Sequence, residues 1–169
     1  MKSGKTKKSK KGKKNHATLQ AIALGAVAGM RAVAAPAVLS HFLANDPAGA
    51  LYNTRLRYLQ RPYVATTLKY LACAELIGDK LPLAPDRIKP MQLGARLLSG
   101  AVVGATVAGA NEKSKLNGAL LGMAGALAAS YGFYFLRKVL GQKSGLPDMA
   151  LGLAEDALAA TGGIAVMKQ

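Results

Sequence analysis

The sequence has little of what most catalytic and metal centres are built from. Its only cysteine, Cys73, excludes an intrachain disulfide and a cysteine-based metal cluster. Its two histidines, His16 and His41, lack the spacing of a metal-ligand pair, and no glycine-rich phosphate loop is present. The sequence therefore assigns no catalytic residue, no metal and no cofactor, and it favours a protein that is not an enzyme.

Large aromatic side chains are also scarce. Tryptophan is absent and aromatic residues make up 5% of the chain, although 51% of the residues are hydrophobic. Alanine, leucine, valine and glycine supply most of that fraction, and such residues suit closely packed helices. The composition predicts an all-α fold, with a soluble alanine-rich bundle as the alternative to a membrane bundle.

Acidic residues are few, and the basic residues are unevenly placed. The chain has 23 Lys and Arg against 8 Asp and Glu, and eight of the lysines lie within residues 1–14. We predict that residues 1–15 form a disordered, cytoplasmic, lysine-rich tail, because such a segment cannot bury apolar surface. Each lysine near anionic lipid head groups contributes about 1 kcal/mol of attraction, so membrane lipid is the expected partner and nucleic acid is not.

Apolar windows with few charges occupy most of the remaining chain. Residues 116–136 are 21 in a row without a charged side chain. A helix of that length matches the ~30 Å hydrocarbon core of a bilayer. We therefore predict that residues 16–169 form one polytopic membrane helix bundle, with Pro36 kinking the first helix. It would have about five helices, at residues 17–44, 63–81, 91–111, 116–140 and 146–167.

The distribution of Lys and Arg predicts the orientation of this bundle. With the N-terminus inside, the inner segments carry fourteen Lys and Arg and the outer segments carry six. The tail decides this difference. We expect a multi-pass inner-membrane (plasma-membrane) protein with a cytoplasmic N-terminus and, after five spans, a C-terminus on the opposite side.

Glycines recur four residues apart within three of the predicted helices. This spacing lets helix backbones approach closely, which drives helix association in lipid. It predicts helix packing faces, and a homo-oligomer is a candidate assembly. The pairs are Gly25 with Gly29, Gly100 with Gly104, and Gly118 with Gly122.

Two pairs of segments suggest an internal repeat. Residues 25–30 resemble residues 118–123, and residues 71–76 resemble residues 151–156. Helices one and two would then correspond to helices four and five in an inverted repeat, as in many transporters. Biased composition is the alternative explanation.

Charged residues lie where the apolar windows should exclude them. A charge at the bilayer centre costs at least about 2.5 kcal/mol, so these groups should face protein or water and pair. We predict that Arg31 pairs with Glu155 or, failing that, with Glu75. Such a cluster is either a structural ion-pair network or a site for an ion, a proton or an anionic head group. Its candidate members are Arg31, Glu75, Asp79, Arg96, Glu155 and Asp156.

Several of these segments together resemble a known family. Residues 25–41, 74–87, 94–105 and 145–159 are similar to the bacterial membrane proteins grouped as the domain-of-unknown-function family numbered 4126. The resemblance extends over residues 17–165. It implies an integral membrane protein without an assigned activity, and it supplies no catalytic residues.

These observations favour a small transporter or channel-like protein with a buried Arg and carboxylate cluster. A structural or accessory membrane subunit is the alternative. A metal-dependent lipid head-group enzyme, using carboxylates on facing helices, is the third candidate.

Overall fold

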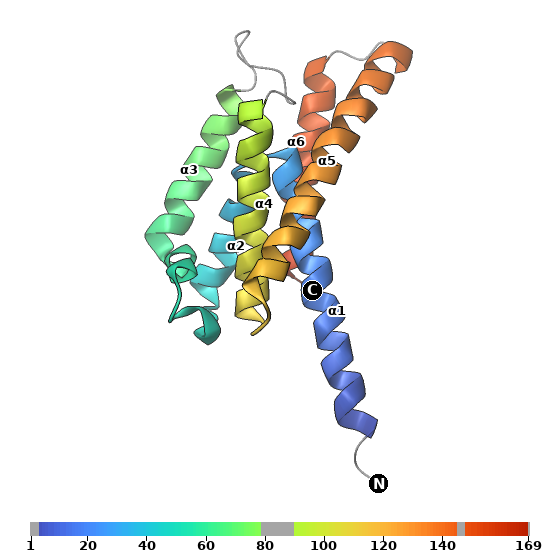
Figure 1. Cartoon of the computed structure of the whole chain (residues 1–169). Helices are drawn as coiled ribbons and strands as arrows, with labels where there is room; N and C mark the ends of the chain where they lie inside the picture. The colour runs from blue at the N-terminus through green and yellow to red at the C-terminus, as the bar shows by residue number, and fades with distance from the viewer. Residues whose placement is uncertain (1–3, 79–89, 145–147, 169) are drawn as a thin grey trace.

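The chain is helical throughout the part that the structure describes. The computed structural model describes residues 4–78, 90–144 and 148–168, and these contain no strand. The all-α prediction is thus confirmed. The elements are α1 Gly4–Met30, α2 Ala34–Asn45, the 3-10 helices η1 Gly49–Leu51 and η2 Arg55–Gln60, α3 Pro62–Gly78, α4 Pro90–Ala110, α5 Lys115–Ser144 and α6 Asp148–Met167 (Figure 1).

The first predicted helix is two helices. We expected one helix over 17–44 with a kink at Pro36, but α1 ends at Met30 and α2 begins at Ala34. From this break α2 turns back toward the end of the bundle from which α1 came (Figure 1). Pro36 lies in the first turn of α2, where a missing N–H costs no helical hydrogen bond. The described residues therefore contain six α-helices instead of about five.

The return of α2 changes the topology. The beginning of α1 and the end of α6 lie toward the same end of the bundle, which we call the lower end as drawn in Figure 1. The hydroxyl of Ser40 in α2 donates to the carbonyl of Leu59 at 2.6 Å. This hydrogen bond joins α2 to the segment between α2 and α3, which we call the lower connector. The predicted placement of the C-terminus opposite the N-terminus is wrong, because the first predicted span does not cross the bundle.

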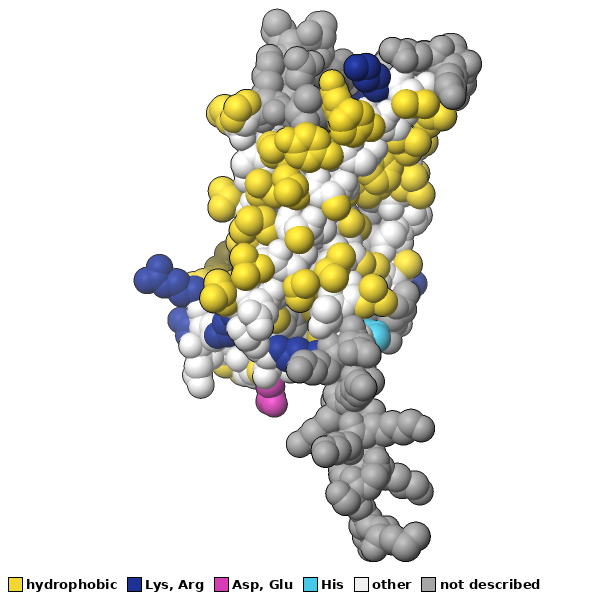
Figure 2. Space-filling view, turned by 45° about the vertical axis from the view of Figure 1, so that its right-hand side comes forward, with side chains coloured by type: hydrophobic (Ala, Val, Ile, Leu, Met, Phe, Trp, Pro, Cys, Tyr) yellow, Lys and Arg dark blue, Asp and Glu magenta, His cyan; other side chains and the backbone are white. Residues whose placement is uncertain are grey.

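Three described helices are long and apolar enough to cross a membrane. They are α4, residues Lys115–Leu140 of α5, and residues Ala150–Met167 of α6. Apolar side chains cover much of the lateral surface between the two ends, and Lys and Arg gather at the lower end (Figure 2). The protein is thus an all-helical membrane bundle.

Glycines form the centre of the contact between α1, α4 and α5. A Cβ added at Gly122 would overlap the carbonyl group of Gly100, and one at Gly25 would overlap that of Gly122. Gly104 and Gly118 face each other in the same way, and Gly29 lies against Ala126. The six glycines singled out by their spacing therefore all lie where helix backbones touch.

The order of these contacts gives the helix directions. The α1–α5 contacts advance together from Gly25 with Gly122 to Gly29 with Ala126, so α1 and α5 are parallel. Segments 25–30 and 118–123 therefore run in the same direction through the bundle. In an inverted repeat the two segments would run in opposite directions, so their parallel course does not fit the predicted inversion.

The lysine-rich segment continues the first helix. We predicted disorder over residues 1–15, whereas α1 begins at Gly4. Lysine is a good helix former, and the segment extends a helix that is already packed at its other end.

Candidate functional site

The break between α1 and α2 places open backbone groups inside the bundle. A helix that ends leaves carbonyl groups without partners, and a helix that begins leaves N–H groups without partners. Within a membrane these groups must be satisfied by the protein itself. The residues that satisfy them define the candidate site.

Glu75 of α3 receives the free N–H groups. Its Oε1 accepts the N–H of Ala32 and its Oε2 accepts the N–H of Val33, each at 2.9 Å. Val33 is the N-cap residue of α2 and has no side-chain acceptor of its own. Glu75 therefore caps α2 from another helix, and its negative charge suits the positive end of the α2 dipole.

Two serines receive the free carbonyl groups. The hydroxyl of Ser99 in α4 donates to the carbonyl of Ala32. The hydroxyl of Ser130 in α5 donates to the carbonyl of Gly29 at 3.1 Å. Sequence reasoning missed both serines, although each is an isolated hydroxyl within an uncharged window, and that was the available signal.

Arg31 lies in the break itself and forms an ion pair with α6. Its side chain is buried, and its Nε donates to Oδ1 of Asp156 at 2.6 Å. A second guanidinium nitrogen contacts the same oxygen. The partner is thus Asp156, one residue beyond the predicted Glu155.

The other predicted members of the cluster lie elsewhere or outside the described residues. Glu155 is buried on the side of α6 that faces α5, where it lines a small cavity together with Phe133 and Arg137. Arg96 is buried on α4. Asp79 lies outside the described residues. The structure therefore brings together three of the predicted residues around the break, which are Arg31, Glu75 and Asp156.

A cavity of about 420 Å³ leads to this centre between α2, α3 and α6. Arg31, Glu75 and Asp156 line one end of it, and His41 and Lys69 line it nearer the lower end. Nζ of Lys69 lies 3.1 Å from Nδ1 of His41, so a protonated Lys69 donates to that nitrogen. We call this cavity the α2–α3–α6 groove.

The site offers carboxylates but no evident metal cluster. Among the described residues, no group of three or more His, Cys, Asp or Glu side chains is arranged to hold a metal ion. The chemistry available at the break is ion pairing, hydrogen bonding and exchange of a proton at a carboxylate.

Comparison with known proteins places the chain in a family. The model of the domain of unknown function DUF4126 matches residues 18–168, so the chain belongs to that family, and the predicted resemblance is confirmed. No curated protein and no solved structure matches the chain. With its three long apolar helices, the chain is an integral membrane protein of unassigned activity.

Proposed function

We propose that the protein is a small secondary transporter whose binding centre is the break between α1 and α2. The observation that carries the proposal is the buried Arg31–Asp156 ion pair at a helix break that opens into a groove. Transporters commonly bind their substrates at such interrupted helices, because helix ends supply hydrogen-bonding groups inside the membrane.

The ion pair supports a specific cycle. While Asp156 is ionised, it holds the guanidinium of Arg31. Protonation of Asp156 would remove that negative charge, and an anion could then take the place of the carboxylate beside the buried guanidinium of Arg31. One proton and one anion would then move together, so the site would never carry an uncompensated charge.

We place the lower end of the bundle in the cytoplasm of a cell whose plasma membrane holds the protein. The lower end carries the lysine-rich start of the chain and the connector with Arg55, Arg57 and Arg61. Cytoplasmic loops carry an excess of Lys and Arg, which supports this orientation.

Reconstitution into vesicles tests the transport proposal. Purified protein would be placed in vesicles that contain a pH-sensitive dye, and inward gradients of chloride, phosphate or succinate would be imposed one at a time. We expect one of these anions to acidify the lumen, and we expect Asp156→Asn to abolish that acidification. Asp46→Asn removes a carboxylate from the exposed lower connector and should behave as wild type. Acidification by none of the anions, or unchanged acidification in Asp156→Asn, would refute the proposal.

One observation favours a structural or accessory subunit as the second candidate. Both oxygens of Glu75 accept backbone N–H groups, from Ala32 and Val33. These two hydrogen bonds hold α3 against the start of α2, which is a structural role. If the protein were only structural, Asp156→Asn would lower folded yield together with any activity. A transporter would keep its yield and lose coupling.

A further inference from the structure

We infer that the α2–α3–α6 groove binds one acyl chain of an anionic phospholipid from the lower leaflet, with the phosphate held by Lys69 and Lys168. The inference does not depend on the proposed transport activity. It rests on the lining of the groove, the surface around its opening and the charges at its lower end.

The lining of the groove suits a hydrocarbon chain. Between its two polar ends it is formed by small or apolar side chains of three helices, including Ala37, Val38, Ala72, Leu76 and Ala160. Residues Ala34 to Phe42 of α2 form its floor and span about 12 Å at 1.5 Å per residue. A narrow apolar channel of this length can take a segment of one acyl chain.

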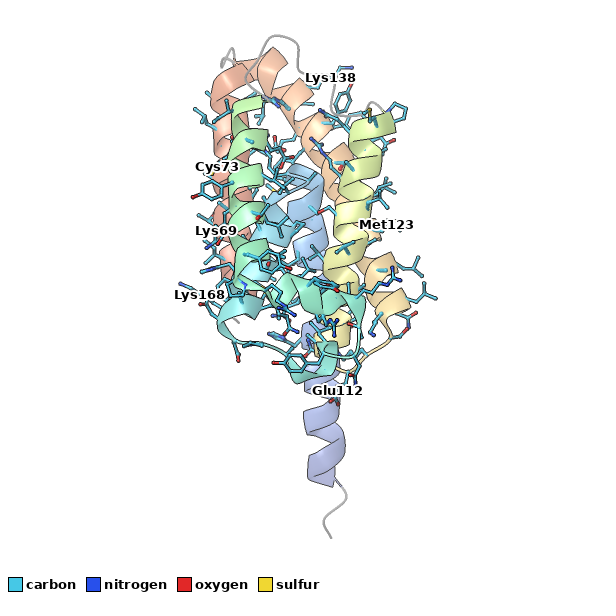
Figure 3. All side chains as sticks on the ribbon, turned by 90° about the vertical axis from the view of Figure 1, so that its left-hand side faces the viewer. Lys69, Cys73, Glu112, Met123, Lys138 and Lys168 are labelled. Carbon is cyan, nitrogen blue, oxygen red and sulfur yellow. The ribbon has the colours of Figure 1, made fainter. Side chains whose placement is uncertain are left out.

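The surface around the opening is the surface that meets lipid. Tyr70 and Ile77 on α3 and Ile164 on α6 are large hydrophobic side chains that are exposed, and Ile164 also lines the groove. Lys69 and Cys73 lie along the left-hand edge of α3 in Figure 3, and both line the groove. A groove framed by exposed apolar side chains on membrane helices opens toward hydrocarbon, so lipid is the molecule at hand to fill it.

The charged side chains at the two ends of the groove determine which lipid head group it binds and at which end the head group lies. At the inner end, Arg31 is paired with Asp156 and Glu75 is bound to the backbone, so among the described residues that line this end the cation already faces a carboxylate. Toward the lower end, Lys69 is exposed, and its hydrogen-bond partner His41 accepts without cancelling its charge.

A second lysine approaches from the opposite wall. The N–H of Lys168 donates to the carbonyl of Ile164 at 3.1 Å, so Lys168 lies one helical turn below a residue that lines the groove. Lysines near a helix end extend toward the membrane interface, where lipid phosphates lie. The lower end of the groove is therefore complementary to an anionic head group.

The absence of tryptophan provides a clean test. Phe42→Trp places the only tryptophan in the groove, and Phe135→Trp places one on the exposed surface of α5, away from the groove. Each variant would be reconstituted in phosphatidylcholine vesicles with a minor share of brominated phosphatidylglycerol or, separately, of brominated phosphatidylcholine. Bromine quenches tryptophan only at close range, so the ratio of the two signals reports head-group preference at each position.

We expect Phe42→Trp to show about a fivefold preference for phosphatidylglycerol, which one lysine near an anionic group can supply. Phe135→Trp should show a much smaller preference. Adding Lys69→Gln and Lys168→Gln together to Phe42→Trp should remove the preference, whereas Lys115→Gln, at the lower end of α5, should leave it unchanged.

Two outcomes would overturn the inference. Equal quenching by both lipids at Phe42→Trp, or a preference that survives the double change of Lys69→Gln and Lys168→Gln, would show that these lysines select no lipid. Quenching by neither lipid would show that another helix, such as one from a second copy, covers the groove.

Discussion

The capping of α2 by Glu75 makes a quantitative prediction about stability. The carboxylate accepts two N–H groups, each at 2.9 Å, at a helix start that has no other side-chain cap. A hydrogen bond to a charged group contributes about 1.5 to 3 kcal/mol, and a buried N–H left without a partner costs a similar amount. Glu75 should therefore be among the most important side chains for the stability of the bundle.

Two substitutions at this position should differ in a defined way. Glu75→Gln keeps one acceptor oxygen but turns an amide N–H toward the second backbone donor, so we expect a loss of about 2 kcal/mol. Glu75→Ala removes both acceptors and should cost about 4 kcal/mol, twice the single loss.

Reversible unfolding in mixed micelles, followed by circular dichroism, measures these free energies. Asp46→Asn is the matched control, because it makes the same kind of carboxylate-to-amide change at an exposed position between α2 and α3. A Glu75→Gln protein as stable as wild type would refute the capping argument. Equal losses for Gln and Ala would show that the charge matters and the two-acceptor geometry does not.

Three further predictions follow from the packing, the ion pair and the topology. Gly122→Ala should destabilise the bundle by about 2 kcal/mol in the same unfolding assay, because its Cβ would overlap the backbone of Gly100. Gly132→Ala in the same helix, where a Cβ meets nothing within 4 Å, should stabilise it by up to about 1 kcal/mol. Arg31→Ala should cost about 3 to 5 kcal/mol by leaving Asp156 buried and unpaired, and adding Asp156→Ala should recover part of that loss. Reporter fusions to the two termini should report the same side of the membrane, and opposite sides would contradict the return of α2.

The predictable part of the fold was the part governed by local composition. Largely apolar windows predicted α4, α5 and α6 nearly to their ends, since each of these helices spans the bundle without a break. The helix packing faces could also be predicted, from the glycine spacing, because two helix backbones approach most closely where both lack side chains. Gly122 shows this most directly, as it lies between Gly25 of α1 and Gly100 of α4.

The break between α1 and α2 could not be predicted in the same way. Residues 17–44 are apolar except for two positions, and Pro36 suggested a bend several residues too late. What stabilises the break is a carboxylate on α3, distant in sequence, that binds the N–H groups of Ala32 and Val33. A helix end capped from another helix leaves no local signal.

Sequence alone could not predict which of two neighbouring carboxylates pairs with Arg31. Adjacent carboxylates on a helix point about 100° apart, so the choice between Glu155 and Asp156 depends on how α6 is rotated against the break. The sequence predicted correctly that Arg31 pairs with a carboxylate of the last helix. The rotation of α6 about its axis, which selects the carboxylate, depends on packing against the other helices. Asp156 faces Arg31, while Glu155 faces the cavity between α5 and α6.

The break also explains why the intramembrane charges are tolerated. Had residues 17–44 crossed as one helix, the N–H groups of Ala32 and Val33 would bind carbonyls of their own helix, and the half-buried carboxylate of Glu75 would lack these two partners. The broken helix and the acidic side chain therefore require each other. Arg31, placed at the turn by the same break, then needs its own carboxylate, which α6 supplies in Asp156.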